Sequence, residues 1–163
     1  MHDLYKIFEI SADNYKDTFM IREAKKEDSL VLATMARKIW DNDSIEELKK
    51  EFEGFADDSN IHSFIKYKDD KAIGFANISI RYDYVEGCES TPVAYLEGIF
   101  IDEKYRNRGY GRQLVNTCED WARSNNIKEF ASDCELTNAN SLSFHLAIGF
   151  IEANRIICFK KDL

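Results

Sequence analysis

The chain has 163 residues, of which 44% are hydrophobic and 13% aromatic. This size and composition suit one globular domain with a buried core, and they exclude disordered, collagen-like and low-complexity proteins. Acidic residues outnumber basic ones by 30 to 22, for a formal net charge of −8. That charge opposes binding to nucleic acids or anionic membranes and favours a cationic partner.

In chain order, the hydrophobic pattern predicts one α/β domain with a mixed sheet. Residues 1–19 carry no strong periodicity, so we expect a peripheral N-terminal extension there and a domain that spans residues 20–163. Ser44 and Glu47 have the spacing of a capping box, which marks a helix start. After an extended start at Met20, the expected elements are helices at Leu30–Trp40 and Ser44–Phe55, strands at His62–Tyr67, Ala72–Tyr82 and Ala94–Ile101, a helix at Tyr110–Asn125, a strand at Lys128–Cys134, a helix at Asn138–Ile148 and a last strand at Ile151–Phe159.

Cysteine spacing and hydropathy bear on the location of the protein. The four cysteines form no CxxC pair and have no histidine-rich neighbourhood, so we expect reduced thiols, no disulfide framework and no metal site. No stretch resembles a signal-peptide core or approaches the ~20 apolar residues of a membrane span. We therefore expect a cytoplasmic protein.

A phosphate-binding loop is the strongest local signal, with a solvated glycine turn as the alternative. Unpaired amides at a helix start and the helix dipole attract anions, and glycines let the backbone approach them closely. The loop lacks the Gly-Lys-Ser/Thr of Walker A, and Leu114 stands where the dinucleotide fingerprint needs Gly or Ala. Between the strand and the next helix, two glycines and four cations give the loop this character: Gly109, Gly111, Lys104, Arg106, Arg108 and Arg112.

Two motifs resemble the GNAT superfamily of N-acetyltransferases, and the resemblance covers the chain from about Met20. Arg106-x-x-Gly109-x-Gly111 is similar to the pyrophosphate-binding signature, and Asn138-x-x-Ser141-x-x-x-His145-x-x-x-Gly149-Phe150 is similar to the second element. The resemblance implies a central sheet flanked by helices, with acetyl-coenzyme A as co-substrate. The coenzyme A contacts that it implies are Ile99, Ile101, Arg106, Arg108, Gly109, Tyr110, Gly111, Arg112, Asn138 and Ser141.

His145 occupies a position that commonly holds a tyrosine in that family, where the tyrosine protonates the leaving thiolate. By resemblance, His145 is a candidate general acid. A histidine beside Phe144 and Leu146 on a helix is also typical of a packed or capped side chain, so both interpretations stay open.

A narrower resemblance, to the aminoglycoside 6'-N-acetyltransferases, covers most of the C-terminal half. Its motifs are Tyr82–Gly98, Glu119–Arg123, Phe130–Asp133 and Arg155-x-x-Cys158-Phe159. It implies acetyl transfer to the 6'-amino group of a cationic aminoglycoside, antibiotic resistance, and a homodimer. The apolar run Ile156–Phe159 fits a strand that needs a partner, in its own sheet or in a second chain. Two other functions stay open: acetylation of a polyamine or protein amino group, and a coenzyme A sensor without catalysis.

Charge is segregated along the sequence, because residues 82–97 contain four acids and no base, the opposite of the phosphate-binding loop. Strand alternation places Glu97 on the face of Ile99 and Ile101, and Asp133 together with Glu135 on one face of the next strand. If those strands are neighbours, three carboxylates converge, although ordinary solvated acids would give the same pattern. We expect Asp133 to be the base and Glu97 its partner in a direct attack by the amine on the thioester.

Gly98, in the middle of a predicted strand, indicates a β-bulge or a simple kink. By resemblance to GNAT proteins, a bulge would splay the strands and admit the pantetheine arm. Trp40, Tyr84 and Glu89 complete the expected substrate contacts with Glu97, Asp133 and Glu135, although the aromatic residues are equally typical of a core.

Overall fold

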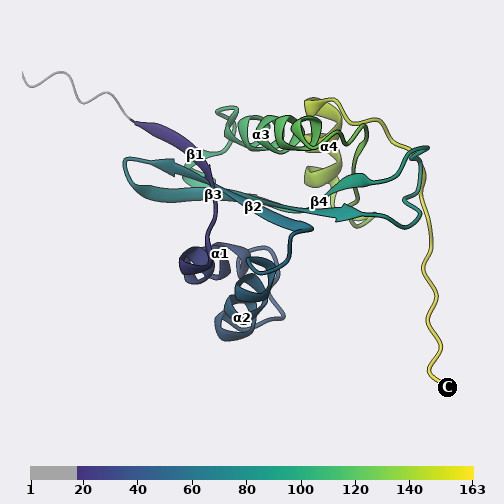
Figure 1. The fold of residues 1–163 in the computed structure, drawn as a ribbon, viewed down its shortest axis with the longest axis horizontal. Coiled ribbons are helices and arrows are strands. Elements are labelled where there is room, and N and C mark those ends of the chain that lie inside the picture. Colours follow the sequence, from purple (N-terminus) through teal and green to yellow (C-terminus); the bar gives the residue numbers. More distant parts are fainter. Residues whose placement is uncertain (1–17) are drawn as a thin grey trace, which may run out of the picture.

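A five-stranded sheet between two layers of helices organises the molecule (Figure 1). The structure is a computed structural model that describes residues 18–163, so residues 1–17 of the predicted extension lie outside the described part. The strands pair in chain order: β1 (Phe19–Glu23), β2 (Ile61–Lys68), β3 (Lys71–Arg81), β4 (Val93–Ile101) and β5 (Phe130–Ser132). Neighbours from β1 to β4 are antiparallel and β5 joins β4 in parallel, which confirms the predicted mixed sheet.

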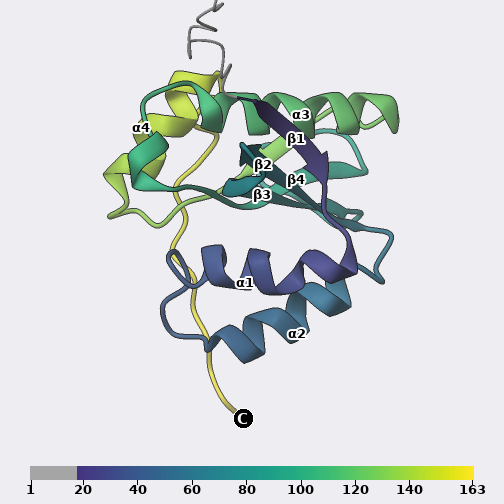
Figure 2. The same ribbon diagram turned by 90° about the vertical axis from the view of Figure 1, so that its left-hand side faces the viewer.

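The helices cover both faces of the sheet (Figure 2). On one face lie α3 (Tyr110–Ser124) and α4 (Ala139–Ile148), and on the other lie α1 (Ser29–Ala36) and α2 (Ile45–Phe55). The predicted capping box is confirmed, because Ser44 Oγ accepts from the amide of Glu47 at 3.2 Å and the Glu47 carboxylate accepts from the amide of Ser44 at 2.9 Å. No helix in residues 18–163 combines the length and the apolar character that a membrane crossing needs.

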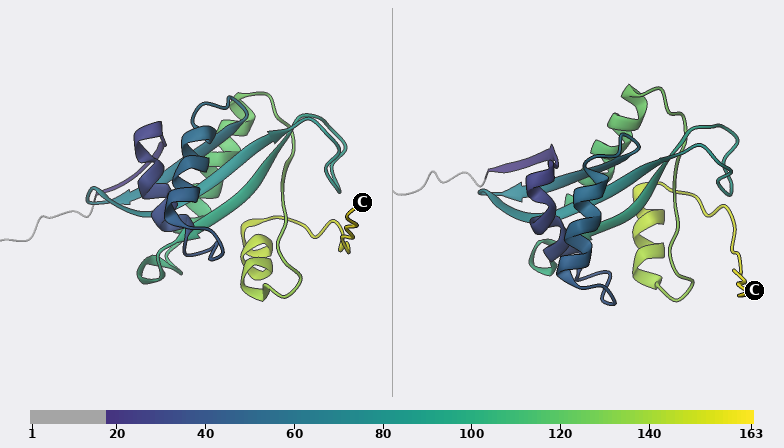
Figure 3. Two further views of the ribbon diagram at one scale, coloured as in Figure 1. Left: turned by 90° about the horizontal axis from the view of Figure 1, so that it is seen from below. Right: turned by 60° about the horizontal axis from the view of Figure 1, so that its bottom comes forward.

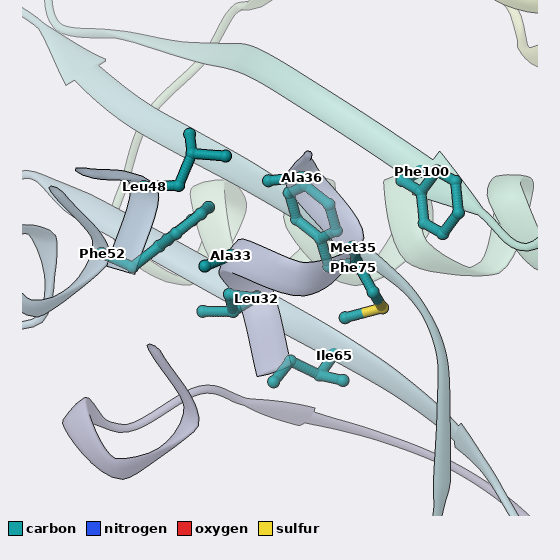
Figure 4. Close-up of a cluster of buried hydrophobic side chains, with 9 residues drawn as sticks. All are labelled: Leu32, Ala33, Met35, Ala36, Leu48, Phe52, Ile65, Phe75 and Phe100. Atoms are coloured by element: carbon teal, nitrogen blue, oxygen red, sulfur yellow. The ribbon is translucent and has the colours of Figure 1, made fainter. Parts of the chain in front are cut away.

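Each face of the sheet buries its own hydrophobic core. Between the sheet and α1–α2 lies a cluster of nine buried residues that includes Phe75 (Figure 4). Between the sheet and α3, a second cluster is built on Leu96 from β4 and Leu114 and Val115 from α3. Full burial of one Leu, Val or Phe side chain contributes about 1.5–3 kcal/mol to the stability of the fold. The two cores fix the sheet between the layers and so separate what lies on one face from what lies on the other.

A β-bulge interrupts β4 at the predicted glycine. Asn77 of β3 pairs with Gly98, but the next residue, Ile78, pairs with Leu96, which leaves Glu97 as the extra residue. The prediction of a bulge near Gly98 is therefore confirmed. The predicted alternation is wrong, since Ile99 packs toward α3 whereas Glu97 contacts the opposite face through Arg81. An inserted residue reverses the facing of every residue beyond it.

The C-terminal part departs from the prediction in two ways. β5 ends at Ser132, so the predicted strand to Cys134 is too long, and residues 151–163 form no strand although one was expected at Ile151–Phe159. That segment runs away from the body of the protein (Figure 3). A strand requires a backbone partner, and the apolar pattern indicates strand character without saying where the partner lies.

Candidate active site

The phosphate-binding loop is braced against β4 and α4. Gly109 adopts the left-handed conformation with φ 79° and precedes the first residue of α3. Arg106 Nε donates to the carbonyl of Ile101 at 2.9 Å, and the Arg112 guanidinium donates to the carbonyl of Ala147 on α4. Two of the predicted cations therefore hold the loop in place, while Arg108 is exposed. The amides of the first turn of α3 lack intrahelical acceptors, as the predicted diphosphate contact requires, and that contact stays a prediction.

Gly111 brings α3 and α4 together. A Cβ atom on Gly111 would lie 2.9 Å from Cε2 of Phe144, so a larger residue would require the Phe144 ring to shift. Asn138 caps α4, because its Oδ1 accepts from the amide of Ser141 at 3.0 Å. The structure thus gives Asn138 and Ser141 a structural task beside the coenzyme A contact that the resemblance implies.

His145 lies half-buried between α4 and β5. Its Nδ1 is 2.7 Å from the carbonyl oxygen of Ser141, and its Nε2 is 2.9 Å from Oγ of Ser132. The ring stands edge-on to Phe144 and Phe150, with centroids 5.8 Å and 5.2 Å away. The side chain is therefore both packed and hydrogen-bonded at the end of β5.

Glu97 lies on the opposite face of the sheet and is bound by Arg81, which the sequence analysis missed. Nη2 of Arg81 is 2.8 Å and 2.9 Å from the two carboxylate oxygens of Glu97, and Ser79 donates to the same carboxylate. The guanidinium also stacks on Tyr95, with its Cζ 3.3 Å from the ring centroid. An arginine near the end of β3 gives no signal of this pairing until the register and the bulge are known.

Two acidic groups, Asp133 and Glu97, lie near Tyr95 on this face. Burial, then the charge and hydrogen bonding of Asp133, raise the pKa of Tyr95 to about 12, and Glu97 adds to the rise while Arg81 opposes it. Asp133 and Glu97 are therefore brought together around one phenol, as expected. The predicted third carboxylate, Glu135, lies two residues further beyond the end of β5 than Asp133, and it is not among the groups that act on Tyr95.

The aromatic candidates take different positions. Trp40 lies on the bulge, since a Cβ atom on Gly98 would be 2.7 Å from its Cζ2, and it is half-buried beside Phe75. It thus lies on the same face of the sheet as Glu97. Tyr84 is 81% exposed and donates to Glu86 at 2.8 Å. Trp40 is therefore packed against the bulge and the hydrophobic core, and Tyr84 lies on the loop surface; substrate contact by either residue stays a prediction.

Glu129, also missed by the sequence analysis, holds the acidic loop between β3 and β4. Its carboxylate accepts from the hydroxyl and amide of Ser90 and from the amide of Glu89. These hydrogen bonds, the Ser90 hydroxyl first, hold the pKa of Glu129 below its usual range. At the other side of the loop, Asn154 donates to Glu86 at 2.8 Å. The predicted substrate residue Glu89 therefore has a fixed backbone and an exposed side chain.

The fold and the two-faced site define an acetyltransferase of the GNAT class. The acetyltransferase (GNAT) family model matches residues 8–150, and the chain belongs to this family. Among curated relatives, the aminoglycoside N(6')-acetyltransferase type 1 of Klebsiella aerogenes is 36% identical over 88% of this chain and 97% of the relative. The enzyme of that name from Salmonella typhimurium strain LT2 is 44% identical over 63% of this chain and 70% of the relative.

Solved structures show the same likeness. Aminoglycoside N-acetyltransferase AAC(6')-Iy in complex with coenzyme A superposes with a TM-score of 0.87 at 34% identity, covering 90% of this chain and 97% of that one. The structure of AAC(6')-Iy with the bisubstrate analogue CoA-S-monomethyl-acetylneamine gives a TM-score of 0.85 at 34% identity, with 90% and 99% covered.

Proposed function

We propose that the chain transfers the acetyl group of acetyl-coenzyme A to the 6'-amino group of aminoglycosides and so confers resistance to them. The observation that carries the proposal is the separation of charge at the point where β4 and β5 part. A basic loop and a helix start lie on one face of the sheet, and Glu97 and Asp133 lie around Tyr95 on the other. The relatives named above support the choice of acceptor.

The acceptor-side carboxylates perform two tasks in this proposal. An amine with a pKa of ~10.4 is unprotonated in only about one molecule in 2,500 at pH 7, so it needs a base. Asp133 takes the proton, directly or through water, and Glu97 attracts the ammonium. Arg81 is bound to Glu97, so the substrate ammonium must share or replace that ion pair.

On the donor face, the residues present fit acetyl-coenzyme A as a substrate. The Arg106–Arg112 loop would hold its pyrophosphate, and β4 beyond the bulge has no β5 partner, which leaves a strand edge for the pantetheine arm. Burial raises the pKa of Cys118 to about 12, which disfavours that thiol as a covalent carrier and favours direct attack. The free cysteines of the described residues also suit a reaction in the cytoplasm.

The test is release of free coenzyme A from acetyl-coenzyme A with a panel of aminoglycosides, polyamines and lysine peptides. The matched control is a pair of aminoglycosides that differ only in carrying an amino or a hydroxyl group at the 6' position. We expect turnover with the 6'-amino compound and none with the 6'-hydroxyl compound. Preferential turnover of a polyamine or a peptide would assign the enzyme to that acceptor instead.

We also propose that the enzyme is a homodimer in which residues 151–163 extend the sheet of a second copy. β5 is an edge strand of three residues, and an edge strand readily accepts another strand. The exposed fractions of Ile156, Ile157 and Phe159 are 67%, 81% and 92%, which is unusual for apolar residues of a monomer. We expect light scattering to report a dimer at micromolar concentration, and a protein without residues 156–163 to be a monomer. A full-length monomer would overturn the proposal.

A further inference from the structure

Ser132 lies where β4 and β5 part. It is the last residue of β5 and pairs with Leu96, the residue that precedes the bulge. Its Oγ is 3.1 Å from the carbonyl oxygen of Leu96 and 2.9 Å from Nε2 of His145. One hydroxyl therefore joins β4, β5 and α4 at the opening between the strands.

At this opening the side chains of the consecutive residues Ser132 and Asp133 lie on opposite faces of the sheet. Ser132 faces α4 through His145, whereas Asp133 lies beside Tyr95 on the face of Glu97. The basic loop and the start of α3 lie on the Ser132 side, so the leaving sulfur of coenzyme A belongs on that side. The amine approaches from the Asp133 side. The reacting thioester therefore lies between the side chains of two neighbouring residues.

The contacts of His145 are compatible with two arrangements of the protons on His145 and Ser132. The carbonyl of Ser141 can only accept, so Nδ1 carries a proton. The nearest acceptors for the single proton of Ser132 are Nε2 at 2.9 Å and the Leu96 carbonyl at 3.1 Å, with the Asp133 carbonyl further away at 3.5 Å. If Ser132 donates to Leu96, then Nε2 must donate to Oγ and the ring is an imidazolium; if Ser132 donates to Nε2, the ring is neutral. The residues that contact the ring, Ser132, Ser141, Phe144 and Phe150, are all uncharged.

We propose that Ser132 is the catalytic group that protonates the leaving sulfur, and that His145 is a positioning residue that resupplies its proton. The amine nitrogen bonds to the acetyl carbon, the carbon–sulfur bond breaks, and its electron pair goes to sulfur. The Oγ proton of Ser132 passes to sulfur, the Nε2 proton of His145 passes to Oγ, and water reprotonates the neutral ring. The proton of the amine leaves on the Asp133 side, so the products are an amide and a thiol.

The proposal rests on the proposed acetyl transfer, but its first test needs no turnover. Coenzyme A is bound to the full chain, and the ultraviolet absorbance of its thiolate is followed against pH, with desulfo-coenzyme A as the blank that cancels the protein's own thiols. Hydrogen bonds to the thiolate favour its ionised form. We expect the bound thiol to ionise about 1–2 pH units lower in the parent than in Ser132→Ala, with Ser132→Thr close to the parent.

Turnover provides the second readout. Ser132→Ala should lower kcat about 10²-fold with little change in KM for acetyl-coenzyme A, because general acid catalysis is worth at least this much. Ser132→Thr should recover most of the rate. His145→Gln keeps a donor near Oγ but cannot deliver a proton, so it should lower kcat while the thiol still ionises below the Ser132→Ala value. The matched control is Ser143→Ala, an exposed serine on α4, which should behave as the parent does.

Unchanged thiol ionisation in Ser132→Ala would overturn the proposal whatever happens to turnover, because it would mean that Ser132 does not touch the sulfur. A shifted thiol with unchanged kcat would overturn the catalytic role. Circular dichroism of each variant checks the fold, and His145→Gln and Ser132→Thr carry the test if Ser132→Ala does not fold. If aminoglycosides are not acetylated, turnover is measured with whichever amine is accepted, since the leaving thiol is the same, and the thiol titration stands without any acceptor.

Discussion

Arg81 and Glu97 form a two-point ion pair on the face of the sheet that we propose receives the amine, with Nη2 of Arg81 2.8 Å and 2.9 Å from the two carboxylate oxygens. The pair lies over Tyr95 and next to the bulge. A site for a polycation thus contains a cation of its own. If Glu97 binds the acceptor as proposed, the acceptor must compete with Arg81 for it, and we expect this arginine to affect substrate affinity.

Arg81→Gln should therefore lower KM for a cationic acceptor by about two- to fivefold at low ionic strength, since partly exposed ion pairs are worth roughly 0.2–1 kcal/mol. The difference should shrink as salt rises. Steady-state kinetics at two salt concentrations measure it. Arg123→Gln, which removes a surface ion pair of α3, is the matched control and should leave KM unchanged. A higher KM in Arg81→Gln would show that Arg81 itself binds the substrate.

Asp133→Asn keeps the size of the side chain but removes the base. We expect kcat to fall ~10²–10⁴-fold at pH 7 while coenzyme A affinity is unchanged. The variant should recover disproportionately as pH rises, because free amine then becomes abundant. Asp120→Asn, an exposed acid on α3, is the control. Equal activity of Asp133→Asn and the parent at neutral pH would transfer the role of base to Glu97.

Two substitutions of Gly109 test separately the effects of backbone strain and of charge at the phosphate-binding loop. Its φ of 79° costs an alanine roughly 1 kcal/mol, so Gly109→Ala should weaken coenzyme A binding about fivefold. Gly109→Asp should weaken it further, because a carboxylate then faces the pyrophosphate. Calorimetry measures both affinities, with Gly54→Asp on α2 as the control. Unchanged affinity in Gly109→Asp would place the pyrophosphate elsewhere.

The burial of Lys66 leads us to expect that the stability of the protein depends on pH. It is 2% exposed on β2, its Nζ donates to Gln113 at 2.6 Å, and burial lowers its pKa. In the unfolded chain Lys66 has its ordinary, higher pKa. Between the lowered pKa of the folded state and this ordinary pKa, the unfolded chain therefore binds more protons, and the free energy of unfolding rises with pH. Lys66→Met should be more stable by ~1–2 kcal/mol at pH 7 and should lack that rise.

Urea denaturation at neutral and alkaline pH measures this difference. Lys128→Met, an exposed lysine beyond α3, should change stability little at either pH and serves as the control. If Lys66→Met were less stable than the parent at pH 7, the contacts of the ammonium with Gln113 and the Tyr110 ring would outweigh its desolvation.

Residues 1–17 should be dispensable. The described sheet begins at Phe19, which pairs with Lys68, and both hydrophobic cores described above are built from later residues. A protein that starts at Thr18 should therefore keep kcat and its melting temperature. A truncated protein that stays folded but loses most of its turnover would show that the extension contributes to the site.

The sequence allowed local features to be predicted better than relations between segments. The capping box of Ser44, the bulge at Gly98 and the glycine loop depend on a few neighbouring residues, and each was found. The side of the sheet on which Glu97 lies depends on which residue the bulge inserts. The contact between Arg81 and Glu97 depends on the register of β3 against β4, and neither can be read from neighbouring residues. The C-terminal residues 151–163 have strand-like composition, but composition does not specify a partner.

The anchoring of the acidic loop by Glu129 bears on how acceptor preference evolves. One side of the loop is held by hydrogen bonds from backbone amides and the Ser90 hydroxyl to the Glu129 carboxylate, which involve no exposed side chain such as that of Glu89. Such exposed positions can vary while this side of the loop keeps its shape. The donor half, on the other face of the sheet, would be unaffected. A laboratory search for new amine acceptors should therefore randomise the exposed loop positions and leave Glu129 and Ser90 fixed.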